Sequence, residues 1–200
     1  MLFYFRLLIL LFICSSQCVY AEDYLKSARD GQPNAQYQHA MNLLKESRGS
    51  EALDWLIIAA AQGHLKSSFW IKQNTDYQQD KFLNTLVKLN AELENKIKPY
   101  SSGELKEMKA VGNKGDSDTQ LLMWLLYVNN LYITKPKAYV WIKKSAGNKQ
   151  PRALFGLGLL YYYGYIVPEQ KNKAFSLFNE SAELSFNFAS LFLKKFVQAE

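Results

Sequence analysis

The chain has 200 residues, 24 of them basic and 18 acidic, and it contains two cysteines. This length is enough for one hydrophobic core or one short solenoid. The net charge of +6 suits an acidic protein surface or anionic headgroups as a partner, but along the sequence it is not clustered enough to predict nucleic-acid binding.

The first 21 residues predict a secretory signal peptide. Arg6 is the only charged residue in this segment, an apolar run follows at 7–14, and Val19-x-Ala21 supplies the small residues of a cleavage site. We expect cleavage before Glu22. The alternative, an uncleaved membrane anchor, is disfavoured because the apolar run is shorter than the roughly 20 residues that span a bilayer. We therefore expect the periplasm as the location, with the extracellular space as the alternative.

Both cysteines, Cys14 and Cys18, lie inside this segment. The mature chain, residues 22–200, would then contain none. A disulfide framework, a thiolate nucleophile and a cysteine metal site are excluded for it.

The mature chain opens with a predicted pair of helices over residues 28–66. Pro33 stands at the start of a helix, where its missing N–H costs nothing. The second helix carries small residues that allow close packing around one large aromatic side chain, in the spacing Ala52-x2-Trp55-x3-Ala59-Ala60.

Residues 67–108 keep an apolar periodicity but match this pattern poorly, which indicates a degenerate repeat with an insertion. The apolar positions predict an amphipathic helix over 82–97, about five turns long, and Pro99 ends it. Residues 101–104 supply the capping residues of a further helix. The alternative, a flexible linker, does not account for the periodicity.

The pattern returns over residues 109–148, where the second helix has Ala138-x2-Trp141-x3-Ser145-Ala146. Trp124 occupies a position where the next unit has Gly158. Either the neighbouring helix is displaced there, or Trp124 faces a groove. Asn130 replaces the turn glycine, and asparagine tolerates a left-handed backbone.

The clearest unit covers residues 149–184, and a C-terminal helix is predicted over 185–198. Glycines within its first helix allow that helix to press closely against a neighbour. Gly164 then ends the helix in a left-handed position, and Pro168 forces an extended link into the second helix.

The spacing in this last unit resembles the Sel1-like repeat, a relative of the tetratricopeptide repeat. The family usually has Asp where this chain has Gln170. The resemblance implies an all-α fold: a right-handed α-solenoid of helical hairpins, with about ten helices after the signal peptide, in a single domain over 22–200. The matching residues are Ala153, Leu157, Gly158, Tyr161, Gly164, Val167, Ala174, Leu177, Ser181 and Ala182.

Catalytic chemistry is not indicated. We expect His39 to be packed within its helix and His64 to face solvent. The carboxylate pairs at 104/107 and 116/118 are expected to stabilise the first turns of helices. The sequence has no glycine-rich phosphate loop and no nucleophile elbow. We predict a non-enzymatic protein without cofactor or metal.

Partner contacts are expected between the keyed positions, on the concave face that the first helices of a solenoid line. Aromatic side chains in such places can anchor a partner. The alternative for Tyr162 and Tyr163 is packing against the C-terminal helix. The predicted contact residues are Leu154, Tyr162, Tyr163, Tyr165 and Trp124.

The resemblance implies a monomeric adaptor that binds another protein: an envelope component, a signalling protein or a secreted effector. A sharper version is an immunity protein that neutralises a phospholipase effector delivered by a type VI secretion system. A hydrolase of cell-wall or β-lactam substrates, as proposed for cysteine-rich relatives, is disfavoured because the mature chain lacks their cysteines. Attachment to a membrane surface through Lys194 and Lys195 is a weaker alternative.

Overall fold

The computed structural model describes residues 25–131 and 134–197. Every regular element in these residues is helical, which confirms the predicted all-α class. The predicted signal peptide, 1–21, lies outside the described residues. No helix within the described ranges combines the length and the apolar character needed to cross a membrane. The helices are α2 (Pro33–Lys45), α3 (Gly49–Ala61), α4 (Leu65–Asn74), α5 (Lys81–Ala91), α6 (Ser102–Asn113), α7 (Ser117–Val128), α8 (Lys135–Gly147), α9 (Pro151–Tyr163), α10 (Lys171–Glu183), α11 (Asn187–Phe192) and a π-helical segment, Leu193–Val197.

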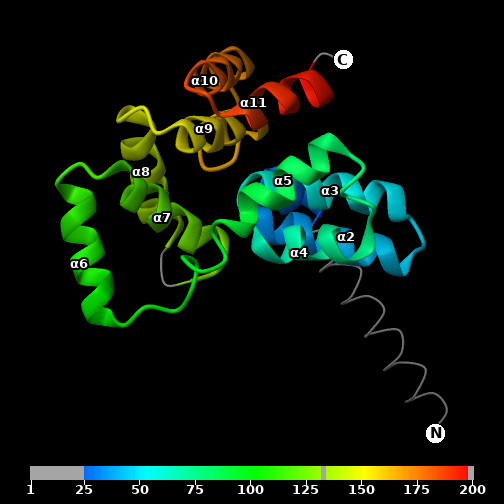
Figure 1. Ribbon diagram of the computed structural model, residues 1–200, viewed down its shortest axis with the longest axis horizontal. Helices are drawn as coiled ribbons and strands as arrows, with labels where there is room; N and C mark the ends of the chain where they lie inside the picture. The colour runs from blue at the N-terminus through cyan, green and yellow to red at the C-terminus, as the bar shows by residue number, and fades with distance from the viewer. Residues whose placement is uncertain (1–24, 132–133, 198–200) are drawn as a thin grey trace, which may run out of the picture.

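Consecutive helices pair into hairpins that stack on one another (Figure 1). α2 packs on α3, α4 on α5, α7 on α8 and α9 on α10. Contacts of α3 with α4 and of α8 with α9 join neighbouring hairpins. α6 packs against α7 and stands at the outer end of the stack, while α11 packs on both α10 and α5.

The first and third hairpins share the same buried side-chain network, which shows that they are copies of one unit. Gln36 and Gln120 each donate from Nε2 to the carbonyl oxygen eight residues earlier, at 3.2 and 2.7 Å. Gln62, after α3, donates to Oε1 of Gln36 at 2.9 Å. Asn148, after α8, donates to Oε1 of Gln120 at 3.0 Å. Each network ties the start of a hairpin to its end.

Helix α5 is shorter than the sequence pattern predicts. Asp80 caps its start by accepting two backbone N–H groups of the first turn, at 2.8 and 3.0 Å. The helix ends at Ala91, and residues 92–98 form turns and bends. Leu93 and Ile97 are nevertheless buried. The apolar spacing therefore continues past the helix end, so periodicity alone overestimated the length.

Helix α9 approaches its neighbours closely because it carries two glycines. A Cβ at Gly156 would lie 2.8 Å from an α8 side chain, and one at Gly158 would lie 2.6 Å from the ring of Phe178 on α10. Gly164 ends the helix with φ 67°, and Asn130 has φ 60° in the turn after α7. Both turn positions are left-handed, as the sequence predicts.

Polar contacts join the first hairpin to the third, which is not its neighbour in sequence. Asn34 on α2 donates from Nδ2 to the carbonyl oxygen of Val128 at the end of α7, at 2.9 Å. Asn129 donates from Nδ2 to the carbonyl oxygen of Gly63 at 3.0 Å. The Oδ1 of Asn129 accepts the N–H of Leu65 at 2.9 Å.

The first hairpin also reaches the turn after α9. A Cβ on Gly31 would lie 2.8 Å from Cβ of Tyr163 and 3.0 Å from Cβ of Tyr165. In an extended solenoid each repeat contacts only its neighbours. Here the stack curls back on itself, because the residues around the first hairpin also touch the end of α7 and the end of α9.

Candidate protein-binding surface

The five residues predicted to contact a partner pack against other parts of the same protein. Leu154 and Trp124 are each 2% exposed, Tyr165 is 3% exposed, Tyr162 is 7% exposed, and Tyr163 is half-buried. These side chains are therefore not available on an open concave face. A role for them in partner binding stays a prediction, and it would require the hairpins to separate.

Aromatic contacts hold these residues in the interior. The ring centroid of Tyr162 lies 6.0 Å from that of Phe175, so Tyr162 packs on α10. The hydroxyls of Tyr165 and Tyr127 are hydrogen-bonded to each other. Trp124 is 2% exposed, and its indole nitrogen would lie 3.9 Å, an ordinary contact distance, from a Cβ at Gly156 of α9. Trp124 is thus a core residue.

His64 is buried, so the prediction that it faces solvent is wrong. Its Nδ1 accepts the backbone N–H of Ser67 at 3.3 Å and caps the start of α4. Its Nε2 lies 3.1 Å from Oδ1 of Asn34. Burial lowers the pKa of His64 to about 4, so the ring is neutral at pH 7. Nδ1 being an acceptor, Nε2 carries the proton and donates to Asn34.

The Ser67–His64–Asn34 chain resembles a nucleophile, base and orienting group, but its surroundings make it structural. Ser67 and His64 are 0% and 1% exposed, so a substrate has no path to them. His64 also corresponds in position to Gln150, whose side chain accepts the N–H of Ala153 at 2.8 Å and caps α9. The equivalent cap in another repeat supports a packing role.

The remaining titratable candidates also have structural roles. His39 lies edge-on to Trp55, with ring centroids 5.2 Å apart. Glu104 forms a capping box with Ser101, and Asp116 accepts the N–H of the third residue after it at 2.7 Å. These hydrogen bonds lower the pKa of both carboxyl groups. Among the described residues, no group of His, Cys, Asp and Glu side chains could hold a metal ion.

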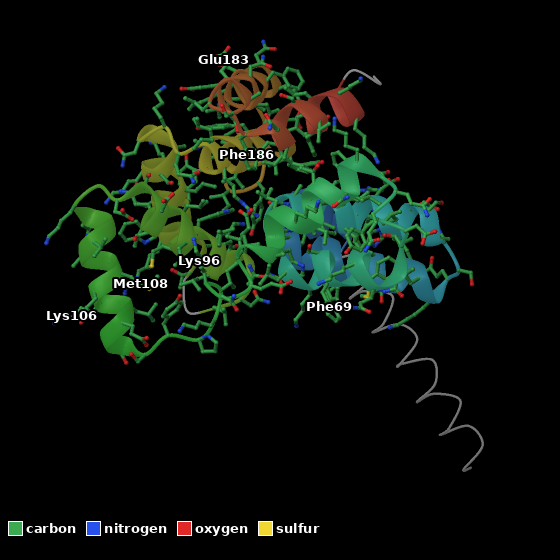
Figure 2. The ribbon with its side chains drawn as sticks, viewed as in Figure 1. Phe69, Lys96, Lys106, Met108, Glu183 and Phe186 are labelled. Atoms are coloured by element: carbon green, nitrogen blue, oxygen red, sulfur yellow. The ribbon has the colours of Figure 1, made fainter. Side chains whose placement is uncertain are left out.

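An open groove of about 440 Å³ runs along α4 and has an aromatic rim. Phe69 is 61% exposed, more than the other exposed large hydrophobic side chains of the described residues. Figure 2 shows it at the outer edge of the helices α2–α5. We call this the α4 groove; its lining residues are Tyr37, Leu65, Lys66, Phe69, Trp70, Asn74 and Glu94.

The sequence of α4 forces Phe69 outward. Ser67 and Ile71 are four residues apart, so they share one helix face, and both are fully buried. Phe69 lies midway between them and so projects from the opposite face. Trp70 is partly buried at the flank. The adjacent Phe–Trp pair was a sequence signal for this surface, because neighbouring positions on a helix cannot both face one core.

The groove has a firm wall and a polar rim. The ring centroid of Tyr37 on α2 lies 5.2 Å from that of His64. His64 is fixed in turn by its hydrogen bonds to Asn34 and Ser67. The exposed side chains of Lys66 and Glu94 supply one charge of each sign. An apolar side chain of a partner would find aromatic surface there, with charges at the edge for orientation.

A second hollow, of about 280 Å³, lies between the α5 end, α7 and the start of α9. Lys96 and Phe186, both labelled in Figure 2, line it. Arg152 borders it and is only 8% exposed. Its guanidinium donates to the carbonyl oxygen of Leu89 at 3.0 Å and to Oδ1 of Asn90 at 2.5 Å. These bonds join α9 to α5, so Arg152 has a structural role.

The comparisons with known proteins give a partial likeness to a solved structure. No family model matches the chain, and no curated protein matches it. Among solved structures, it is similar to a Sel1 repeat protein from Oxalobacter formigenes, with 24% identity and a TM-score of 0.44. The alignment covers 88% of this chain and 48% of the other, so this chain spans about half that protein's length. The helical-hairpin architecture is established by the contacts described above.

Proposed function

We propose that this chain is a non-enzymatic module that binds another protein through the α4 groove. The observation that carries the proposal is the 61% exposure of Phe69 at the rim of a groove with an aromatic wall. Exposed aromatic side chains beside apolar pockets are the residue type that anchors protein interfaces. The groove also uses α2 and α4, the first helices of their hairpins.

The expected partner presents at least one apolar side chain to Phe69 and Trp70. Opposite charges at its edge would meet Lys66 and Glu94. We further propose that the binding takes place in the periplasm, which rests on the signal-peptide pattern of residues 1–21. The partner classes that the family resemblance implies, an envelope or signalling protein or a phospholipase effector, are distinguished by identifying the protein that occupies the groove.

Site-specific crosslinking tests the proposal. A photoreactive phenylalanine analogue replaces Phe69 in one variant and Val111 in a control. Val111 is 45% exposed on α6, away from the groove. A partner crosslinked at position 69 is identified by mass spectrometry and purified. We expect Phe69→Ala to weaken its binding by about thirtyfold, because truncating an anchor costs about 2 kcal/mol.

The control sets the standard for specificity. Val111→Ala should leave the affinity for the purified partner unchanged. The proposal would be overturned by equal crosslinking from positions 69 and 111, or by a partner that binds Phe69→Ala as tightly as the unaltered chain.

A further inference from the structure

Acidic residues are missing from one part of the sequence, which leaves that part with an excess of positive charge. No acidic residue occurs between Asp118 and Glu169, whereas this stretch contains five lysines and Arg152. Arg152 is buried and Lys149 forms an ion pair with Glu180, so neither is a free surface charge. The other four lysines are all on α8 and exposed.

A short lysine motif recurs at the start of two successive second helices. α8 begins Lys135-Pro-Lys137-Ala and α10 begins Lys171-Asn-Lys173-Ala. The corresponding position in α3 has Gly49 and an acidic residue two positions later. The third and fourth hairpins therefore carry a feature that the first lacks. We call the four exposed lysines of these two motifs, Lys135, Lys137, Lys171 and Lys173, the Lys-x-Lys patch.

The tyrosines at the end of α9 bring the two motifs together. The ammonium of Lys135 lies 4.5 Å from the ring centroid of Tyr165, and that of Lys171 lies 3.5 Å from the centroid of Tyr162. Lys173 donates to the hydroxyl of Tyr161 at 2.9 Å. The three tyrosines are within five residues of one another, so three of the four patch lysines lie around this one end of α9. The hydrogen bond from Lys173 lowers the pKa of Tyr161, as expected where positive charge gathers.

Almost no negative charge balances the patch. Glu169 lies 3.8 Å from Lys171, and both side chains are largely exposed. The other three lysines of the patch form no ion pair with the described residues. Lys143, also exposed on α8, adds a further positive charge that acts on Tyr161.

Helix stability does not explain these lysines. A helix N-terminus carries partial positive charge and favours Asp or Glu in its first turn. α8 and α10 have no acidic residue in the first turn, and each begins with two lysines. Each placement opposes the helix dipole, so the lysines do not stabilise the starts of these helices.

We propose that the Lys-x-Lys patch docks the protein on an anionic phospholipid surface. The patch consists of lysine rather than arginine, and protein–protein interfaces are enriched in arginine and depleted in lysine. Lysine is a mobile point charge that suits a fluid layer of headgroups rather than the fixed fork of one carboxylate. Val140, which is 48% exposed on α8, adds an apolar contact. This surface is separate from the α4 groove, so both could be occupied together.

Vesicle co-sedimentation tests the proposal with the full chain as purified from the cell envelope. The vesicles contain phosphatidylcholine alone or phosphatidylcholine mixed with phosphatidylglycerol. The test variant carries Lys135→Gln, Lys137→Gln, Lys171→Gln and Lys173→Gln. The control variant changes four other exposed lysines to Gln, with the same net charge: Lys45, Lys72, Lys81 and Lys88.

We expect binding to the anionic vesicles at low salt and its loss at high salt. Each patch lysine should contribute about fivefold to partitioning, since a lysine near an anionic surface is worth about 1 kcal/mol. The test variant should therefore lose most binding, while the control variant and Phe69→Ala retain it.

Three results would overturn the proposal. The first is the absence of binding to anionic vesicles, and the second is an equal loss in the test and control variants, which would indicate net charge alone. The third is salt-sensitive binding of polyglutamate, lost in the test variant, without vesicle binding; that result would assign the patch to an acidic protein.

Discussion

The contact between Asn90 and Arg152 predicts an unusual order of mutational effects. Asn90 accepts from Arg152 and donates from Nδ2 to the carbonyl oxygen of Ala60 at 2.8 Å. Asn90→Ala removes both bonds and leaves the guanidinium with one acceptor, the Leu89 carbonyl oxygen. A hydrogen bond to a charged group is worth about 2 kcal/mol and a neutral one about 1 kcal/mol. We expect a loss of about 3 kcal/mol in the free energy of unfolding.

Arg152→Met should cost less, although it removes a larger polar group. Burial lowers the pKa of Arg152 to about 10. The shift from 12.5 to about 10 means that burial destabilises the charged guanidinium by about 3 kcal/mol, since one pKa unit corresponds to ~1.4 kcal/mol. Replacing the guanidinium removes this penalty together with two hydrogen bonds worth about 4 kcal/mol. The net loss is about 1 kcal/mol, in line with buried ionic groups that are replaced by apolar side chains.

Urea unfolding at pH 7 measures these effects. In the Arg152→Met background, Asn90→Ala should cost only about 1 kcal/mol, which gives a coupling energy of about 2 kcal/mol between the two residues. Asn84→Ala, on the same helix, is the matched control and should be close to neutral: it loses a 3.3 Å hydrogen bond from Nδ2 to the Gln78 carbonyl oxygen, and it also removes a buried Oδ1 that has no partner. A larger loss for Arg152→Met than for Asn90→Ala, or additive effects in the double variant, would refute this reasoning.

Three further predictions test the packing. Burial lowers the pKa of His64 to about 4. Between about pH 6.5 and pH 4, the imidazole is therefore protonated in the unfolded chain and neutral in the folded chain. The free energy of unfolding should fall by about 3 kcal/mol as the pH drops through this window. The fall should be smaller in His64→Asn, which keeps a helix-capping side chain but does not titrate. Equal falls in both proteins would contradict a buried, neutral His64. Gly158→Ala should cost about 1–3 kcal/mol, because the new Cβ would meet the Phe178 ring at 2.6 Å. Gly49→Ala, with no atom within 4 Å, should be neutral or slightly stabilising by thermal unfolding, and a similar loss for both glycines would argue against close packing at α9. Gln36→Ala and Gln120→Ala should each cost about 2 kcal/mol, and clearly different losses would show that the two networks are not equivalent.

The sequence predicted the helical hairpins because their packing follows local spacing. The small residues of α9 and the left-handed turns at Gly164 and Asn130 depend on neighbours within one unit or the adjoining one, and the structure has them where the pattern places them. The length of α5 was overestimated because Leu93 and Ile97 stay buried without a helix. Apolar periodicity predicts which residues are buried, but it does not predict where the helix ends.

The surfaces were harder to predict because they depend on how the stack closes. The contacts of Asn34 with Val128 and of Gly31 with Tyr163 join segments far apart in sequence. The Gly31 contact covers Tyr163 and Tyr165, two of the five residues to which partner binding was assigned, and no local pattern reveals it. The α4 groove and the recurring Lys-x-Lys motif had visible sequence signals, but their importance follows from exposure and grouping in space.

Backbone hydrogen–deuterium exchange tests the central claim most directly, with the identified partner present and absent. If the partner occupies the α4 groove, exchange should slow in α2 and α4, residues 33–45 and 65–74, and stay unchanged at residues 161–167. Slower exchange at 161–167 without protection of α4 would contradict the account. It would return partner binding to the concave face and to Tyr162, Tyr163 and Tyr165.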